Sequence, residues 1–210
     1  MATTNLCIHN LCVGNLQGIS LEIGAGEVHC LSGKSGSGKS RFLRAIADLE
    51  HHEGEVRLTT VEQRDMPAHQ WRQKVRLIPT ESQWWFDTAA EHMQVIPPDN
   101  ILQQLNLEPV ILLKPVNQLS SGEKQRLALI RAMQPAPVAL LLDEPTANLD
   151  RHSQAQVERW LLEMIERHQW PTIWVAHDED QIARVADQHW QLENGKLHHQ
   201  EFTRECHSPY

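Results

Sequence analysis

Eight residues near the N-terminus constrain the fold more than any other stretch of the chain. Residues 33–40 read GKSGSGKS, which matches the pattern G-x-x-x-x-G-K-[ST]. A short apolar run at 28–31 precedes this stretch, and a helix-like segment follows it. The pattern therefore predicts a strand–loop–helix unit whose backbone N–H groups surround phosphate groups. A flexible Gly/Ser linker is the plain alternative, and the tight strand and helix signals on both sides argue against it.

This loop supplies most of the candidate nucleotide ligands. Its glycines let successive backbone N–H groups point inward, and the following helix adds its positive N-terminal end. We expect Lys39 to reach the β- and γ-phosphates of a nucleotide and the Ser40 hydroxyl to bind Mg²⁺. The candidate ligands from this segment are Gly33, Ser35, Gly36, Gly38, Lys39, Ser40 and the next residue, Arg41.

A second signal, farther along the chain, supplies carboxylates. Residues 138–144 read VALLLDE, an apolar run that ends in two acids. A buried parallel strand has this appearance when it presents side chains at its C-terminal edge, where ligands bind. Asp143 is a candidate Mg²⁺ ligand, and Glu144 can orient or deprotonate an attacking water. Two solvated acids at a strand end are the alternative, which the phosphate loop upstream disfavours.

Two further segments point to the same site. The run at 171–176 ends at His177, on the predicted sheet edge that also carries Glu144, so we expect His177 to contact a γ-phosphate; a bystander histidine is the alternative. Residues 117–126 read NQLSSGEKQR and precede a helical pattern. The helix after the phosphate loop already supplies one N-terminal end to a bound triphosphate, so this second helix N-terminus is available to bind a different nucleotide. Ser120 and Gly122 are therefore expected to contact the nucleotide that a second chain holds.

Composition and periodicity narrow the class of protein. The 210 residues suffice for one α/β domain, and no apolar run or N-terminal pattern indicates a membrane span or a secretory signal, so we expect a cytosolic protein. A net charge of −8 argues against nucleic acid as a partner. The four cysteines lack CxxC spacing, which favours reduced, mostly buried thiols. An amphipathic helix is expected over 153–168, and a hairpin turn at 193–196.

Together these motifs resemble the nucleotide-binding subunit of ATP-binding cassette (ABC) transporters over essentially the whole chain. Residues 33–40 resemble the family's Walker A loop, 119–123 its LSGGQ signature, 140–144 its Walker B strand, 147–150 its D-loop and His177 its switch histidine. The resemblance implies an α/β P-loop NTPase fold with a mostly parallel core sheet and an N-terminal antiparallel β subdomain. It also implies one nucleotide-binding domain at 1–210, with a compact helical subdomain at 81–134, and a nucleotide contact from Asp150.

In this family two cassettes close around two ATP molecules, and this closure drives a membrane partner. The resemblance therefore implies an ATPase that uses ATP and Mg²⁺, pairs with a second copy of itself or a similar cassette, and powers a separate permease from the cytoplasmic face of the membrane. A weaker likeness to iron-export-type ATPases rests on LSSGEKQR, TIWVAHDED and Asp87-Thr88. Two alternatives stay open: a soluble ABC ATPase of DNA repair or translation, and an ATP-sensing module with low turnover.

Three positions depart from the family pattern. Thr80 stands where the family places a glutamine that contacts Mg²⁺. Either the Thr80 hydroxyl contacts the ion through a water, or Gln83 takes the place of the family glutamine. Residues 1–30 contain no Phe, Tyr or Trp to stack on adenine, so adenine is expected to be held loosely or by His9. Ser121 replaces the first signature glycine and adds a Cβ to a loop that is expected to be tight.

Three adjacent aromatic residues, Trp84, Trp85 and Phe86, occur in a chain that has seven Trp, three Phe and one Tyr. In the family, the segment after the preceding strand forms part of a groove that receives the membrane subunit. Trp and Phe bury large areas at a small entropic cost, so we predict that permease docking involves these residues. The alternative is packing of the insert onto the main domain. Because adjacent side chains diverge, we expect some of the three to be buried and at least one to be exposed.

Overall fold

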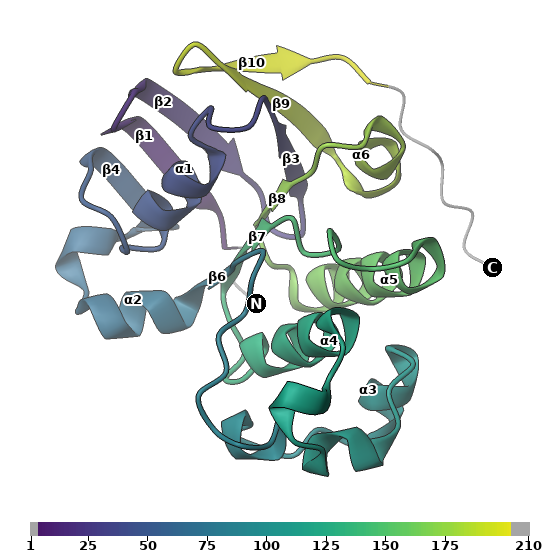
Figure 1. Cartoon of the computed structure of the whole chain (residues 1–210). Helices are drawn as coiled ribbons and strands as arrows, with labels where there is room; N and C mark the ends of the chain where they lie inside the picture. The colour runs from purple at the N-terminus through teal and green to yellow at the C-terminus, as the bar shows by residue number, and fades with distance from the viewer. Residues whose placement is uncertain (1–3, 203–210) are drawn as a thin grey trace.

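Two β-sheets form the centre of the molecule (Figure 1). The structure is a computed structural model that describes residues 4–202. The first sheet is antiparallel, with the strand order β2-β1-β4-β5. The second has the order β10-β9-β3-β8-β7-β6, in which β9, β3, β8, β7 and β6 run parallel and β10 is antiparallel. The strands are β1 Leu6–Val13, β2 Leu16–Ile23, β3 Val28–Ser32, β4 Glu53–Leu58, β5 Val61–Glu62, β6 Val75–Ile78, β7 Ala139–Asp143, β8 Thr172–Val175, β9 Gln188–Glu193 and β10 Lys196–Gln200. This arrangement confirms the predicted α/β class, with an antiparallel N-terminal sheet and a mostly parallel core sheet.

Helices cover both faces of the second sheet and build a separate lobe. The helices are α1 Lys39–Ile46, α2 Ala68–Lys74, α3 Asp99–Gln104, α4 Ser121–Ala132, α5 Arg151–His168 and α6 Glu179–Val185. Short 3-10 turns occur at Gln63–Asp65, Ala90–His92, Pro109–Leu113 and Val116–Gln118. The chain between β6 and β7 carries α3, α4 and three of these turns, and it forms the lower part of the molecule in Figure 1.

The parallel strands separate two hydrophobic cores because successive side chains of a strand point to opposite faces. On β7, Leu140 and Leu142 pack with α5 and the helical segment, whereas Leu141 packs with α1 and the antiparallel sheet. On β8, Trp174 belongs to the first core and Ile173 to the second. A strand buried on both faces needs apolar residues at every position, which is why 138–142 reads as an unbroken apolar run.

Alternating burial explains the antiparallel sheet. In β2 the buried residues Leu16, Ile19, Leu21 and Ile23 alternate with exposed polar ones towards the end of the strand.

The same alternation corrects one expectation about the cysteines. Cys7 and Cys12 lie on β1 between buried neighbours and are only partly buried, whereas Cys30 is buried. The expectation of mostly buried thiols is therefore wrong for both β1 cysteines; Cys206 lies outside the described residues.

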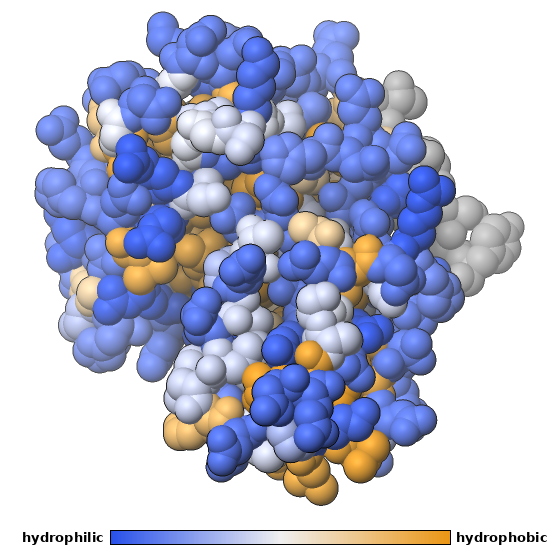
Figure 2. All heavy atoms as spheres, in the orientation of Figure 1, coloured by the Kyte–Doolittle hydropathy of each residue, from blue (hydrophilic) through white to orange (hydrophobic). Residues whose placement is uncertain are grey.

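The surface of the helical lobe is more apolar than that of the strand region. Figure 2 shows apolar spheres gathered on the lower part of the molecule. Among residues 4–202, the most exposed large apolar residues are mainly in this segment: Trp85, Phe86, Val95, Ile96, Val110 and Leu113. Within residues 4–202, no helix has the length and apolar character that crossing a membrane requires.

Candidate nucleotide site

The phosphate loop joins β3 to α1 at the carboxyl edge of the parallel strands. Three of its glycines have a positive φ, which is 145° at Gly33, 77° at Gly36 and 111° at Gly38. A Cβ at Gly33 would lie 2.5 Å from the carbonyl oxygen of Leu192, so this position excludes any side chain. The glycine spacing of the motif is therefore required by the path of the backbone, as the sequence predicts for a loop that curls around phosphates.

Lys39 lies at the start of α1 with its side chain turned back into the loop. Its Nζ donates to the carbonyl oxygens of Gly33 at 2.8 Å and Lys34 at 3.3 Å. Burial lowers the pKa of Lys39, and the nearby carboxylates of Glu144 and Asp143 oppose that shift. The ammonium group is thus held inside the loop and faces two acids, which is the position that phosphate oxygens would share.

The acidic residues after β7 and the histidine after β8 meet at the same edge. β7 and β8 run parallel with Asp143 opposite Val175, so Glu144 and His177 leave the sheet side by side. His177 Nε2 and Glu144 Oε1 lie 2.8 Å apart and form a hydrogen bond. Glu144 has a φ of 51°, which residues other than glycine seldom adopt, and such backbone strain is found preferentially at functional sites.

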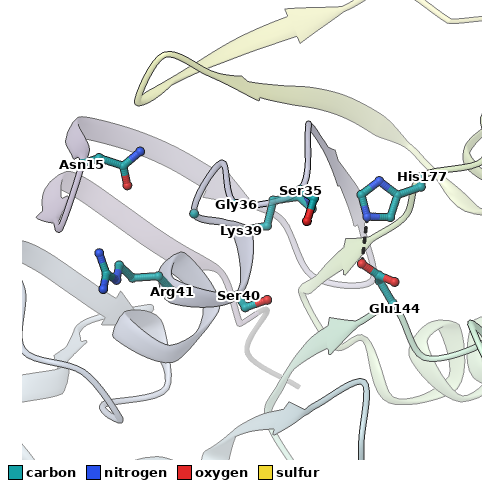
Figure 3. Close-up of a pocket in the computed structure, with 9 residues that line it drawn as sticks. Asn15, Ser35, Gly36, Lys39, Ser40, Arg41, Glu144 and His177 are labelled. Atoms are coloured by element: carbon teal, nitrogen blue, oxygen red, sulfur yellow. Dashed lines mark hydrogen bonds and ion pairs between the residues drawn. The ribbon is translucent and has the colours of Figure 1, made fainter.

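One pocket of about 390 Å³ brings most of the predicted residues together (Figure 3). Glu144 and His177 stand at one end, Arg41 stands at the other, and the loop residues lie between them. The lining residues are Asn15, Ser35, Gly36, Gly38, Lys39, Ser40, Arg41, Glu144 and His177. Eight of these nine are residues that the sequence predicts for the site, and the ninth is Asn15.

A magnesium ion fits the oxygen donors beside the pocket. Burial raises the pKa of the Asp143 carboxyl and Glu144 raises it further, while a hydrogen bond with Ser40 and the charge of Lys39 lower it. A buried carboxylate next to a second acid is stabilised by a cation. The Ser40 hydroxyl and the Asp143 carboxylate are oxygen donors of the kind Mg²⁺ prefers. These two side chains would hold the ion.

Ser120 and Gly122 lie at the start of α4, and neither lines the pocket of its own chain. The Ser120 hydroxyl accepts a hydrogen bond from the Glu123 N–H at 3.2 Å, and the Glu123 carboxylate accepts one from the Ser120 N–H at 2.7 Å. This reciprocal capping box stabilises the helix start. Ser121 is the first residue of α4 and is exposed, so its Cβ meets no crowding. In a single chain, this position is therefore the exposed start of a helix.

Asp150 also lies away from the pocket lining and caps a helix. Its carboxylate accepts hydrogen bonds from the backbone N–H groups of His152 and Ser153 at 3.0 Å and from the Ser153 hydroxyl at 2.7 Å. The hydrogen bonds from Ser153 are the largest cause of the lowered pKa of Asp150. In one chain, the visible role of this residue is to begin α5.

Thr80 contacts the carboxylate strand through the backbone. Its hydroxyl donates to the carbonyl oxygen of Asp143 at 3.0 Å, and the side chain does not line the pocket. Gln83 is exposed and does not line the pocket either, while its carbonyl oxygen accepts a hydrogen bond from Arg131. Thr80 therefore ties the segment that precedes the aromatic residues to the end of β7.

Asn15 is a pocket residue for which the sequence carries no clear signal. It lies in the turn between β1 and β2, and its Nδ2 donates to the carbonyl oxygen of Ser37 at 3.4 Å. His9, which the sequence offers as a possible adenine contact, is exposed on β1 and is not part of the pocket lining. Asn15 reaches the site through tertiary structure, because the turn folds over the phosphate loop.

The aromatic segment surrounds His92. The Nε2 of His92 accepts hydrogen bonds from the backbone N–H groups of Trp85 at 2.9 Å and Phe86 at 3.0 Å, and its Nδ1 donates to the carbonyl oxygen of Thr88. All three aromatic rings pack edge-on around the imidazole. Trp85 is 66% exposed and Phe86 50%, whereas Trp84 packs against the core. The expectation that at least one ring is exposed is confirmed by Trp85 and Phe86, whereas the expectation that some of the three are buried is wrong, because Trp84 is only partly buried. The sequence did not indicate His92 as the centre of this segment.

Sequence comparisons place the chain in a family. A family model described as ABC transporter matches residues 16–147. The sulfate/thiosulfate import ATP-binding protein CysA of Salmonella typhi is 32% identical over 201 residues, which cover 87% of this chain and 54% of that protein. The aliphatic sulfonates import ATP-binding protein SsuB 2 of Rhizobium johnstonii is 35% identical over 188 residues, with coverage of 87% and 72%. Protein STAR1 of Oryza sativa subsp. japonica is 33% identical over 184 residues, with coverage of 82% and 53%. The chain spans about half the length of CysA and STAR1.

Two solved structures share the fold. A bacterial Atm1-family ABC exporter with ATP bound has a TM-score of 0.81 at 24% identity, covering 92% of this chain and 38% of that one. A dimeric ATP-binding cassette in a post-hydrolysis state, bound to ADP and Pi, has a TM-score of 0.80 at 23% identity, covering 93% and 98%. The fold is thus the predicted ABC-type P-loop NTPase fold. The weaker likeness to iron-export-type ATPases has no support from the relatives above. On the match over residues 16–147 and the identity with SsuB 2, the chain belongs to the ABC transporter family.

Proposed function

We propose that this chain is the ATP-binding and hydrolysing subunit that powers a transporter through a separate membrane permease. The observation that carries the proposal is the hydrogen-bonded pair Glu144–His177, which lines the same pocket as the phosphate-loop Lys39. A bound triphosphate would place its terminal phosphate between these groups. The names of CysA and SsuB 2 as import ATP-binding proteins support the transport role.

Each residue of the site has a separate role in the proposed hydrolysis of ATP. Backbone N–H groups of the loop and the Lys39 ammonium bind the phosphates and stabilise the charge that develops as the γ-phosphoryl group is transferred to water. Glu144 orients the attacking water and accepts its proton, and His177 faces the γ-phosphate. The side chains of Ser40 and Asp143 would hold Mg²⁺, which would supply positive charge to neutralise the phosphates.

The position of the α4 start supports a dimer in which each site is shared. In this proposal, residues 1–210 form one nucleotide-binding domain that contains the helical subdomain at 81–134. Ser120 is exposed and Gly122 is partly buried, and both lie outside the pocket of their own chain. Two copies packed head to tail would present this helix start, together with Asp150, to the partner's nucleotide. The proposed assembly is therefore a homodimer, or a pair with a similar cassette, around two ATP molecules.

Mixing two inactive variants tests the shared site. Lys39→Met disables the phosphate loop, and Ser120→Asp places a negative charge at the helix start while keeping a good capping residue. Each variant alone should hydrolyse ATP poorly, and an equimolar mixture should recover towards about a quarter of the wild-type rate, because half of the random dimers carry one intact site. Steady-state phosphate release measures this.

Two further results bear on the shared site. Ser120→Asn keeps the shape and the cap without the charge, so it should retain more activity than Ser120→Asp. A mixture that is no more active than the separate variants would show that Ser120 does not act across a dimer.

The aromatic segment is the proposed docking site for the permease, which would hold the protein on the cytoplasmic face of the membrane. Trp85 and Phe86 are exposed, while Trp84 and the backbone bonds to His92 hold the segment in place. The Arg131 guanidinium lies 4.4 Å from the ring centre of Trp84 and 5.2 Å from that of Trp85. Exposed aromatic side chains on an ordered base are typical of interface hot spots.

Removing the exposed rings should detach the protein from its permease. The double variant Trp85→Ala and Phe86→Ala should lower the amount that sediments with native membranes by at least about tenfold, because a hot-spot aromatic contributes about 2 kcal/mol or more. The exposed Val61→Ala on β5 is the control and should sediment like the wild type. Unchanged sedimentation of the double variant would rule out docking through this segment.

A second candidate function, an ATP-sensing module with low turnover, has one observation in its favour. The Thr80 hydroxyl is bonded to the backbone of Asp143 and does not line the pocket, so no side chain from this position reaches a bound nucleotide directly. The two functions differ in whether Glu144 accelerates hydrolysis. Comparing the ATP hydrolysis rates of the wild type and Glu144→Gln separates them.

A further inference from the structure

The pocket lacks an aromatic platform for a nucleobase. Among the described residues that line it, no side chain is Phe, Tyr or Trp, and the imidazole of His177 is at the phosphate end beside Glu144. The opposite end of the pocket is formed by Asn15 from the β1–β2 turn and Arg41 from α1 (Figure 3). On the proposed function, a nucleotide whose terminal phosphate lies at Glu144 would extend its base towards these two residues.

The Arg41 guanidinium is held in place. Its Nε donates to Oε1 of Glu50 at 2.8 Å, and the Arg41 side chain remains 49% exposed. On the other side, Gly14 leaves the space that the guanidinium occupies. A Cβ at Gly14 would lie 3.0 Å from the Cζ of Arg41 and closer still to Nη1, and Gly14 also has a φ of 56°. The turn, the glycine and Glu50 together position a planar cation at this end of the pocket.

A guanidinium placed this way has the chemistry of a stacking partner. It is planar, delocalised and weakly hydrated, so it packs against the flat face of an aromatic ring or base. Arginine shares this role with aromatic side chains in proteins that bind bases through stacking. Asn15 is anchored to the phosphate loop through Ser37 and borders the same space, where it can limit how far the base tilts.

We propose that Arg41 is the nucleobase platform of this site, taking the place of a stacking aromatic residue. The proposal rests on the proposed nucleotide-binding function and adds to it a residue that binds the base. The competing role for Arg41 is a charge contact to the phosphates alone. The two roles predict different effects on ligands that share the phosphates and differ in the base.

Comparing ATP with inorganic tripolyphosphate, both with Mg²⁺, separates these roles by isothermal titration calorimetry. Arg41→Ala should weaken ATP binding by about 5- to 150-fold, the range expected for loss of one stacking contact, and should change tripolyphosphate binding by less than about threefold. Arg41→Phe should restore most of the ATP affinity, because a ring replaces the planar cation. Arg44→Ala is the matched control, since Arg44 lies one turn along α1, also pairs with Glu50 and does not line the pocket.

The ratio of the two affinities decides the outcome. The deciding quantity is the affinity for ATP divided by the affinity for tripolyphosphate. The base-platform role would be overturned if Arg41→Ala left this ratio at the wild-type value or if Arg44→Ala lowered it as much as Arg41→Ala does. It would also be overturned if the ratio of Arg41→Phe were no higher than that of Arg41→Ala. If the wild-type protein bound neither ATP nor tripolyphosphate, the proposed nucleotide site itself would be wrong. If the wild-type protein bound tripolyphosphate as tightly as ATP, the base-platform role would be overturned, whereas the proposed phosphate site would stand.

Discussion

Glu144→Gln should lower the steady-state rate of ATP hydrolysis by about 10²- to 10⁴-fold, the range that a general base contributes. Glutamine has nearly the same shape, and its amide oxygen can still accept the hydrogen bond from His177 Nε2 that Glu144 Oε1 accepts at 2.8 Å. The pocket should therefore keep its geometry and its affinity for ATP. The measurements are phosphate release under saturating ATP and the ATP dissociation constant.

This prediction also separates the two candidate functions. Glu163→Gln, an exposed position on α5, makes the same change away from the site and should behave like the wild type. If wild type and Glu144→Gln hydrolyse ATP at the same low rate, Glu144 is not the catalytic base and the low-turnover module is the better description. Because ATP would still bind without being consumed, Glu144→Gln should also accumulate an ATP-bound dimer that sedimentation velocity can detect.

Lys39→Met should abolish most nucleotide binding without weakening the fold. Loss of charge-assisted hydrogen bonds of about 1.5–3 kcal/mol predicts an ATP dissociation constant about 10- to 100-fold higher. Hydrolysis should fall by about 10²- to 10³-fold, because the ammonium also stabilises the charge that develops during phosphoryl transfer. Methionine keeps the buried apolar stem of the side chain, so the variant tests the charge and not the packing.

Thermal unfolding of the ligand-free protein provides the control for Lys39→Met. Burial lowers the pKa of Lys39, which means that the folded protein disfavours the charged form relative to the unfolded chain. Removing the charge should leave the Tm unchanged or higher while ATP binding is lost. Lys74→Met, at an exposed position on α2, should alter neither the Tm nor the affinity for ATP. A lower Tm with normal ATP binding would identify Lys39 as a structural residue.

The phosphate loop and the carboxylate strand could be predicted from sequence because their geometry is encoded locally. The positive φ values of Gly33 and Gly38 require residues without a Cβ, and the spacing of such residues is visible in the sequence. A strand buried on both faces needs a continuous apolar run, which ends where Asp143 and Glu144 leave the sheet. His177 follows a similar run, and the parallel pairing of β7 with β8 places it beside Glu144.

Contacts between distant segments could not be predicted this way. The Thr80 hydroxyl meets the backbone of Asp143, and Gly14 makes room for the Arg41 guanidinium, although each pair is far apart in the chain. His92 is only seven residues from Trp85 and six from Phe86, yet its hydrogen bonds to their backbone N–H groups depend on the turn that lies between them. None of these residues has a local pattern that distinguishes it from an ordinary polar or turn residue.

The sequence by itself determined which chemistry this protein can carry: a glycine-spaced phosphate loop, two acids at the end of a buried strand and a histidine at the end of the next. These features depend on backbone geometry and burial, which act over a few neighbouring residues. Tertiary structure decided which side chains share the pocket. It brought Asn15, from the turn between β1 and β2, beside Arg41 at the end opposite Glu144. The physical reason is that pairing and packing of distant strands set these distances, and no local pattern records them.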